Sequence, residues 1–216
     1  MLTSCPHPGR RRWRMIHRRR RARALLAGTL AAAEVLAAGC GGSSSPFSGS
    51  FHAPTGYTAY HGGGYVVAIP HGFLARAGSV PDQPNGSTVT EVTQGGSSAA
   101  KAKSEILLLE NPHLKFSLDQ VVDNLEQADR TNTSVSDVKV TAVKATVPGA
   151  RAARIVTESY VAPDSPSNPA PTHFDRKWLM VLVRPGVLLD VVVANAPALG
   201  GHIDADAVID SFRLRH

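Results

Sequence analysis

The sequence predicts an α+β fold in which a mainly antiparallel sheet is sandwiched between helices. Segments with the composition and spacing of strands fill most of residues 57–216. Four of them form two pairs, each joined through Pro-Gly, which is typical of antiparallel hairpins. Two further segments, which begin at Leu118 and Asp204, are apolar on one helical face only and therefore lie on a sheet.

Three strands are expected before the first helix. The segment "GYVVAIP" (64–70) is apolar and ends at a proline. The segment "STVTEVT" (87–93) is β-branched and alternates, and "SEILLLEN" (104–111) stops at Pro112.

The first helix has a recognisable start. Ser117 is expected to be the N-cap, with Gln120 completing a capping box and Phe116 packing onto Val121 as a hydrophobic staple. Its apolar residues recur at helical spacing on one face: Leu118, Val121, Val122 and Leu125.

Two hairpins follow the helix. The first joins residues 137–147 to 150–161 through Pro148-Gly149, and the second joins 177–183 to 187–195 through Pro185-Gly186. Pro-Gly suits a type II turn, so either loop can be longer than two residues.

The last strands are expected to be covered on both faces. Their apolar run is nearly continuous, which is typical of strands between two layers. A second helix over 204–212, with Asp204 as N-cap, turns three apolar side chains inward: Val208, Ile209 and Phe212.

Residues 1–39 have the three parts of an export signal. Nine of the 23 basic residues lie in residues 10–23, and an apolar run over 24–38 follows. This run is shorter than a membrane span and contains Glu34, which disfavours a permanent transmembrane helix. Translation can start at Met1 or at Met15.

The end of this leader, "LAAGC" (36–40), resembles the lipobox of bacterial lipoproteins. The resemblance implies cleavage between Gly39 and Cys40 and attachment of diacylglycerol to the Cys40 thiol. A plain secretory signal with an incidental cysteine is the alternative, and export through the Sec or the twin-arginine route is left open.

Residues 40–56 are expected to be a flexible tether rich in Gly and Ser, ahead of one domain over 57–216. Beyond Cys40 the chain holds the remaining 14 basic residues against 16 of the 17 acidic residues. The basic pI is therefore a property of the leader, and the domain gives no reason to expect nucleic acid as a partner.

The domain resembles the PsbP-like α/β/α sandwich, and in particular the actinobacterial lipoproteins of the LpqN type. Three motifs carry the resemblance: Gly63-Gly64-Tyr65 through Pro70-His71-Gly72-Phe73, Gly149-Ala150-Arg151-Ala152, and Ala207–Phe212. Relatives of this fold bind protein partners, and the fold by itself implies no catalysis.

The sequence offers no convincing catalytic residue, metal site or cofactor site. "HGGG" (61–64) lacks the nucleophile elbow of an esterase, and "SAAK" (98–101) lacks its companion motifs. Asp190 is the one candidate binding residue, because it lies inside an apolar strand. An ion pair with Lys177 or Arg184, or exposure at a sheet edge, is the structural alternative for it. The proline-rich connection 162–173 is either a variable loop or a partner-binding loop.

These observations predict a lipid-anchored protein on the outer face of the cytoplasmic membrane. Its domain is expected to bind a protein partner or an envelope ligand without catalysis. The alternative is a lipid-anchored hydrolase or solute-handling protein, which requires a serine and a histidine within hydrogen-bond reach of Asp190.

Overall fold

The computed structural model describes residues 51–79, 86–95, 102–163 and 170–215. All of them belong to one compact unit, Ser44–His216. The predicted leader, Cys40, and most of the predicted tether lie outside the described residues, as do 98–101 and the middle of the connection 162–173. The last residues of the predicted tether are described, and the backbone N–H of His71 donates to the Gly56 carbonyl at 2.8 Å.

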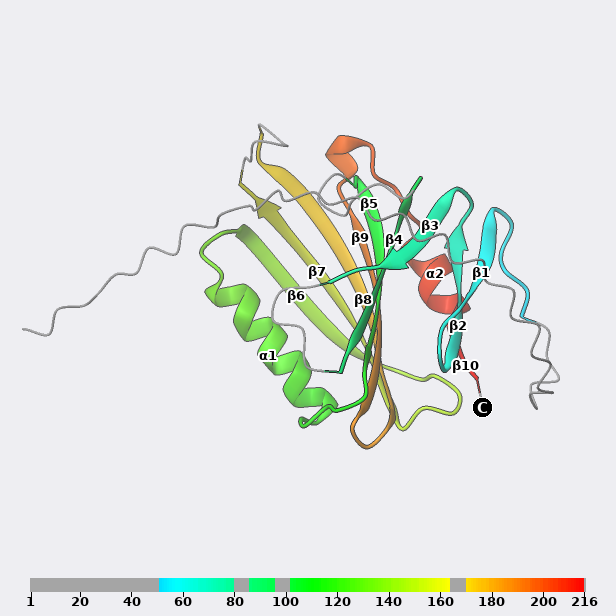
Figure 1. The fold of residues 1–216 in the computed structure, drawn as a ribbon. Helices are drawn as coiled ribbons and strands as arrows, with labels where there is room; N and C mark the ends of the chain where they lie inside the picture. The colour runs from blue at the N-terminus through cyan, green and yellow to red at the C-terminus, as the bar shows by residue number, and fades with distance from the viewer. Residues whose placement is uncertain (1–50, 80–85, 96–101, 164–169, 216) are drawn as a thin grey trace, which may run out of the picture. The chain divides into compact units, whose positions relative to one another are not determined.

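A seven-stranded antiparallel sheet forms the centre of the fold (Figure 1). Its spatial order is β3-β4-β5-β9-β8-β7-β6. The strands are β3 (Phe73–Ala77), β4 (Thr88–Gln94), β5 (Ser104–Asn111), β6 (Ser136–Ala145), β7 (Ala152–Ala162), β8 (Thr172–Arg184) and β9 (Val187–Asn195).

Both predicted hairpins are confirmed, and their loops differ in length. Strands β6 and β7 pair in antiparallel register, and the six residues 146–151 separate them. Strands β8 and β9 are separated only by Pro185 and Gly186, and Gly186 has a φ of 82°. That left-handed conformation is the one a type II turn requires after proline, and glycine adopts it without strain.

A second, three-stranded sheet corrects the expectation of a single sheet. It consists of β1 (Tyr57–His61), β2 (Tyr65–Pro70) and β10 (Arg213–Leu214), with β2 in the middle. The turn at His71-Gly72, where Gly72 has a φ of 81°, separates β2 from β3, and β3 pairs instead with β4, as the edge strand of the seven-stranded sheet.

Strands β1, β3 and β10 have no clear sequence signal because they lie at sheet edges or are very short. Strands β1 and β3 consist only of exposed and half-buried residues, and β10 has two residues. Their backbone groups find partners only once β2 and β4 are in place.

Helix α1 (Leu118–Thr131) confirms the predicted start and its apolar face. The Ser117 Oγ accepts from the Gln120 N–H at 3.2 Å, and the Ser117 N–H donates to Gln120 Oε1 at 2.9 Å. Leu118 and Val122 are buried against side chains of β7, β8 and β9, namely Val156, Met180 and Leu188. Phe116, expected as a staple, is 55% exposed.

Helix α2 (Ala205–Ser211) covers the other face of the central strands. Asp204 caps it by accepting from the Ala207 N–H at 3.0 Å, as predicted. Val208, Ile209 and Phe212 are buried with the side chains of β9 that alternate away from α1. The Phe212 ring stacks on Tyr65 of β2 at 5.5 Å between centroids.

The two faces of the central strands are therefore not covered by one helix each. One face of the central strands carries α1, and the other carries α2, which also packs on β2 of the small sheet. The predicted fold class, a mainly antiparallel α+β fold with helices on both sides, is confirmed. The small sheet extends the layer that α2 forms.

Replacing Leu108 with alanine is expected to lower the free energy of unfolding by about 3 kcal/mol, because it opens a cavity in a close-packed core. Leu108 is 1% exposed in β5, whereas Leu74 in β3 is 58% exposed. The matched variant Leu74→Ala is expected to change stability by less than about 0.5 kcal/mol. Urea denaturation measures both, and equal losses would contradict this placement of the core.

Candidate functional site

A cavity of about 640 Å³ lies between the N-terminal half of α1 and the sheet. Residues of β4, β5 and β9 form one side of it, and the connection from β5 to α1 forms another. Most of its lining is apolar, including Val89, Leu109, Leu114, Val121 and Leu188.

Asp190 of β9 lines this cavity. It pairs with Leu109 of β5 on one side and Met180 of β8 on the other. Because side chains alternate along a strand, Asp190 shares its face with Leu188, which packs against α1. The sequence therefore singled out a residue that the fold brings into a cavity.

The carboxyl group of Asp190 lacks the partners that a buried acid normally has. Its Oδ1 is fully buried and has no hydrogen-bond partner. Burial raises the pKa of Asp190 from 3.8 to about 7, since the charged form is poorly solvated there. Near neutral pH the group is therefore present in both forms, and it can either donate or accept a hydrogen bond.

The predicted ion pair of Asp190 with Lys177 or Arg184 is wrong. Lys177 forms its ion pair with Asp206 of α2, on the opposite face of the sheet. Asp190 is opposite Met180, three residues along β8 from Lys177, so their side chains point to different faces. Arg184 is opposite Val187 at the end of the strand. Edge exposure is also wrong, because β9 lies between β5 and β8.

Ser87 and His113 line the same cavity as Asp190. The His113 ring lies beside Gly86, where an added Cβ would come within 3.1 Å of the ring. The fold thus gathers the three residue types that a hydrolase uses, although Asp190 Oδ1 has no hydrogen bond to either of the others. The three residues are brought together only by the register of β4, β5 and β9. Their positions in the sequence therefore do not indicate that they lie in one cavity.

A second polar cluster lies further along the same face, around Arg176 of β8. Its Nη1 lies 3.6 Å from Glu158 Oε1, and its guanidinium lies 4.8 Å from the centre of the Tyr160 ring. The Trp178 indole N–H donates to the other oxygen of Glu158 at 3.4 Å. Glu158 is 3% exposed, so these contacts provide the partners that its buried charge needs.

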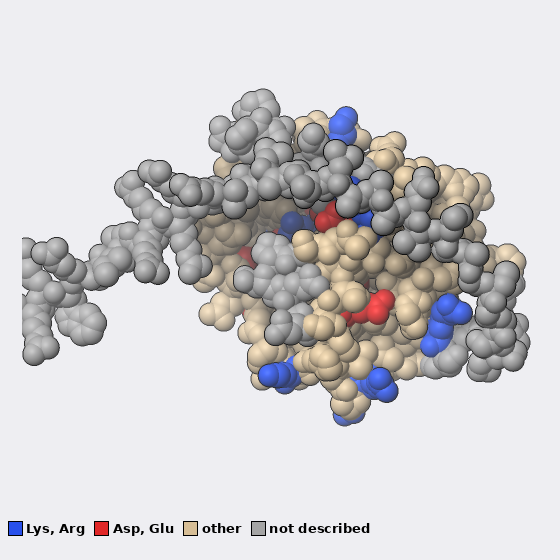
Figure 2. Space-filling view, viewed as in Figure 1, with Lys and Arg blue, Asp and Glu red and all other residues tan. Residues whose placement is uncertain are grey.

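Two further carboxyl groups face this cluster. Glu105 Oε2 and Asp129 Oδ2 are buried without hydrogen-bond partners. Burial raises the pKa of both, to about 6 for Asp129, and the Arg176 charge opposes the increase in each. In Figure 2, atoms of both charge types are visible within a hollow of the viewed face.

The remaining sequence candidates have structural roles where they are described. Residues 61–64 span the turn between β1 and β2, where the Gly62 N–H donates to the Tyr65 carbonyl at 3.0 Å. Asp204 caps α2, and Asp206 pairs with Lys177. Within the described ranges, no group of three or more His, Cys, Asp or Glu is arranged to hold a metal ion. No helix in the same ranges is long and apolar enough to cross a membrane.

Replacing Asp190 with asparagine is expected to make stability less dependent on pH. In the folded chain the pKa of Asp190 is about 7, whereas its ordinary pKa is 3.8, so folding retains the proton over the pH range between these two values. Through this group, the free energy of unfolding falls by about 2–4 kcal/mol as the pH rises from about 4 to about 7. Urea denaturation across that range measures the difference between wild type and variant.

The control for this experiment is Asp123→Asn. Asp123 is exposed on α1, so its replacement is expected to leave the pH profile of stability close to that of the wild type. A wild-type profile that matches the Asp190→Asn profile would contradict the burial of an unpartnered acid in this cavity.

Comparison with known proteins shows a similarity of structure. No family model matches the sequence, and no curated protein matches it. Among solved structures, the chain is similar to the solution structure of cyanobacterial PsbP (CyanoP) from Synechocystis sp. PCC 6803. The sequences are 12% identical, the match covers 77% of this chain and 97% of the other, and the TM-score is 0.47.

Proposed function

We propose that this chain is a lipoprotein of the cell envelope whose domain binds a small ligand without catalysis. The lipobox-like end of the leader supports an anchor at Cys40, with cleavage after Gly39. The anchor holds the chain on the outer face of the cytoplasmic membrane, and the tether 40–56 connects it to the domain. The alternative to a small ligand is a protein partner in the envelope, which the anchored domain would bind.

One observation carries the binding proposal: an unpartnered carboxyl group lines a cavity whose surface is mostly apolar. A buried polar group without a partner costs about 1–3 kcal/mol, and a ligand that supplies the partner recovers this free energy. Asp190 Oδ1 is such a group, and the cavity of about 640 Å³ has the size of small-molecule sites.

The lining of the cavity defines the class of ligand. Apolar side chains such as Val89, Leu109 and Leu188 favour an apolar body. The Asp190 carboxylate favours a hydrogen-bond-donating, basic group, such as a protonated amine. The best-fitting ligand is therefore an apolar amine whose nitrogen lies against Asp190.

Octylamine is expected to bind to this cavity, and octanoate of the same chain length is not. The resonances of Val89, Leu109 and Leu188 in NMR spectra of the full chain are the readout. Asp190→Asn is expected to weaken octylamine binding at least about tenfold, because the charge-assisted hydrogen bond is lost. Asp123→Asn serves as the charge-matched control. Equal binding of both probes, or unchanged affinity of Asp190→Asn, would contradict the proposed role of Asp190.

A second candidate function is hydrolysis, favoured by the presence of Ser87 and His113 in the same cavity. A serine hydrolase needs its histidine hydrogen-bonded to both the serine and the acid. If the full chain turns over p-nitrophenyl butyrate, and Ser87→Ala and His113→Gln both abolish the turnover, hydrolysis replaces ligand binding as the proposed function.

The anchor is tested at the mature N-terminus. Mass spectrometry of the protein from its native envelope is expected to show a chain that begins at Cys40 and carries a diacylglycerol adduct. Cys40→Ser is expected to remove the adduct and release the protein from the membrane fraction, while Cys5→Ser changes neither. An unmodified N-terminus at any other residue would rule out the lipoprotein proposal.

A further inference from the structure

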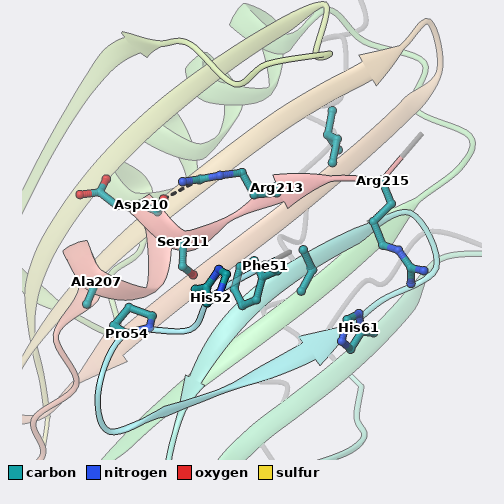
Figure 3. A pocket seen from close by; sticks show the side chains of 11 residues that line it. Phe51, His52, Pro54, His61, Ala207, Asp210, Ser211, Arg213 and Arg215 are labelled. Atoms are coloured by element: carbon teal, nitrogen blue, oxygen red, sulfur yellow. Dashed lines mark hydrogen bonds between the residues drawn. The ribbon is translucent and has the colours of Figure 1, made fainter. Parts of the chain in front are cut away.

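A second cavity, of about 630 Å³, lies beside the small sheet (Figure 3). The segment Phe51–Pro54 lies on one side of it, and α2 and β10 lie on another. Buried residues Val66, Ser211 and Leu214 form its inner surface, and Phe51 adds an aromatic ring. The interior of this cavity is thus largely apolar.

The edge of this cavity is basic because of strand register. His61 of β1 and Arg213 of β10 are both opposite Val66 of β2, so the three side chains share one face of the small sheet. Arg215 follows Arg213 by two residues, and its N–H donates to the Gly64 carbonyl at 2.8 Å, which keeps it in line with the strand. His52 completes the set of basic side chains at the edge.

Asp210 is the one acidic residue among those that line this cavity in the described part of the chain. Figure 3 shows its carboxylate pointing away from the end of the cavity where His61 and Arg215 lie. Arg213 is held near Asp210 through the backbone, since its Nη1 donates to the Asp210 and Phe212 carbonyls at 2.6 and 2.7 Å. Its second terminal nitrogen takes no part in these bonds.

We propose that this cavity binds the head group of an anionic phospholipid from the membrane that carries the anchor. The guanidinium group of Arg215, at the end of the cavity where His61 lies, would hold the phosphate, for which arginine has well-matched geometry. The glycerol and first acyl carbons would lie against Phe51 and Val66. This apolar interior favours a lipid over a free inorganic anion.

The length of the tether supports this choice of ligand, and in this respect the inference rests on the proposed anchor. Phe51 lines the cavity and follows Cys40 by only eleven residues. Such a segment spans at most about 40 Å when extended, and about 17–20 Å on average as a flexible coil. The cavity is therefore kept close to the lipid surface, where even weak affinity gives high occupancy.

The test uses soluble short-chain lipids and the full chain, with site-specific NMR signals as the readout. Dihexanoyl phosphatidylglycerol, below its micelle concentration, is expected to shift the resonances of His61, Val66 and Leu214 in a saturable way. Dihexanoyl phosphatidylcholine and inorganic phosphate are expected to bind at least about tenfold more weakly. Site-specific signals exclude the leader arginines as the source of the effect.

Variants separate the specific role of Arg215 from that of general positive charge. Arg215→Gln is expected to weaken phosphatidylglycerol binding about tenfold, and the exposed Arg130→Gln of α1 is expected to leave it unchanged. Equal binding of the two lipids, equal binding of phosphate, or full affinity of Arg215→Gln would overturn the proposal. The probes are soluble, so a negative result would not bear on the anchor, and a missing anchor would not abolish binding.

Discussion

The fold depends on the burial of β9 on both of its faces. Val191 and Val193 face α2, and Val192 faces the opposite side with α1; each is 1% exposed. An apolar strand of this kind is stable only between two covering layers. The two layers are unequal: in the part of the chain that the structure describes, α1 covers one face, whereas α2 and the three-stranded sheet share the other.

Asp190 is the exception in this apolar strand, and it opposes stability rather than adding to it. A carboxyl group at a site that raises its pKa to about 7 destabilises the folded chain whenever it is ionised. Local conflicts of this kind are typical of functional sites, where a group is held ready for a ligand. The buried Glu158 differs, because Arg176 and Trp178 provide both of its oxygens with partners.

The two proposed sites lie on different sides of the seven-stranded sheet. The Asp190 cavity lies on the α1 face, and the basic cavity lies beside the small sheet and α2. Ion pairs hold each helix to the sheet: Asp119 of α1 with Arg154 of β7 at 2.5 Å, and Asp206 of α2 with Lys177 of β8. In the proposed arrangement, contact between the basic cavity and the membrane leaves the ligand cavity free on the other side.

The sequence by itself determined the elements that have strong local signals. The capping box at Ser117, the N-cap at Asp204 and the two Pro-Gly hairpins depend on neighbouring residues, so local patterns predicted them. Asp190 was recognisable as a polar residue within an apolar strand. Only the tertiary structure decided which side chains surround it, because strand register and face alternation pair residues that are far apart in the chain. For the same reason, the edge strands, the partner of Lys177 and both cavities became apparent only once the sheets were assembled.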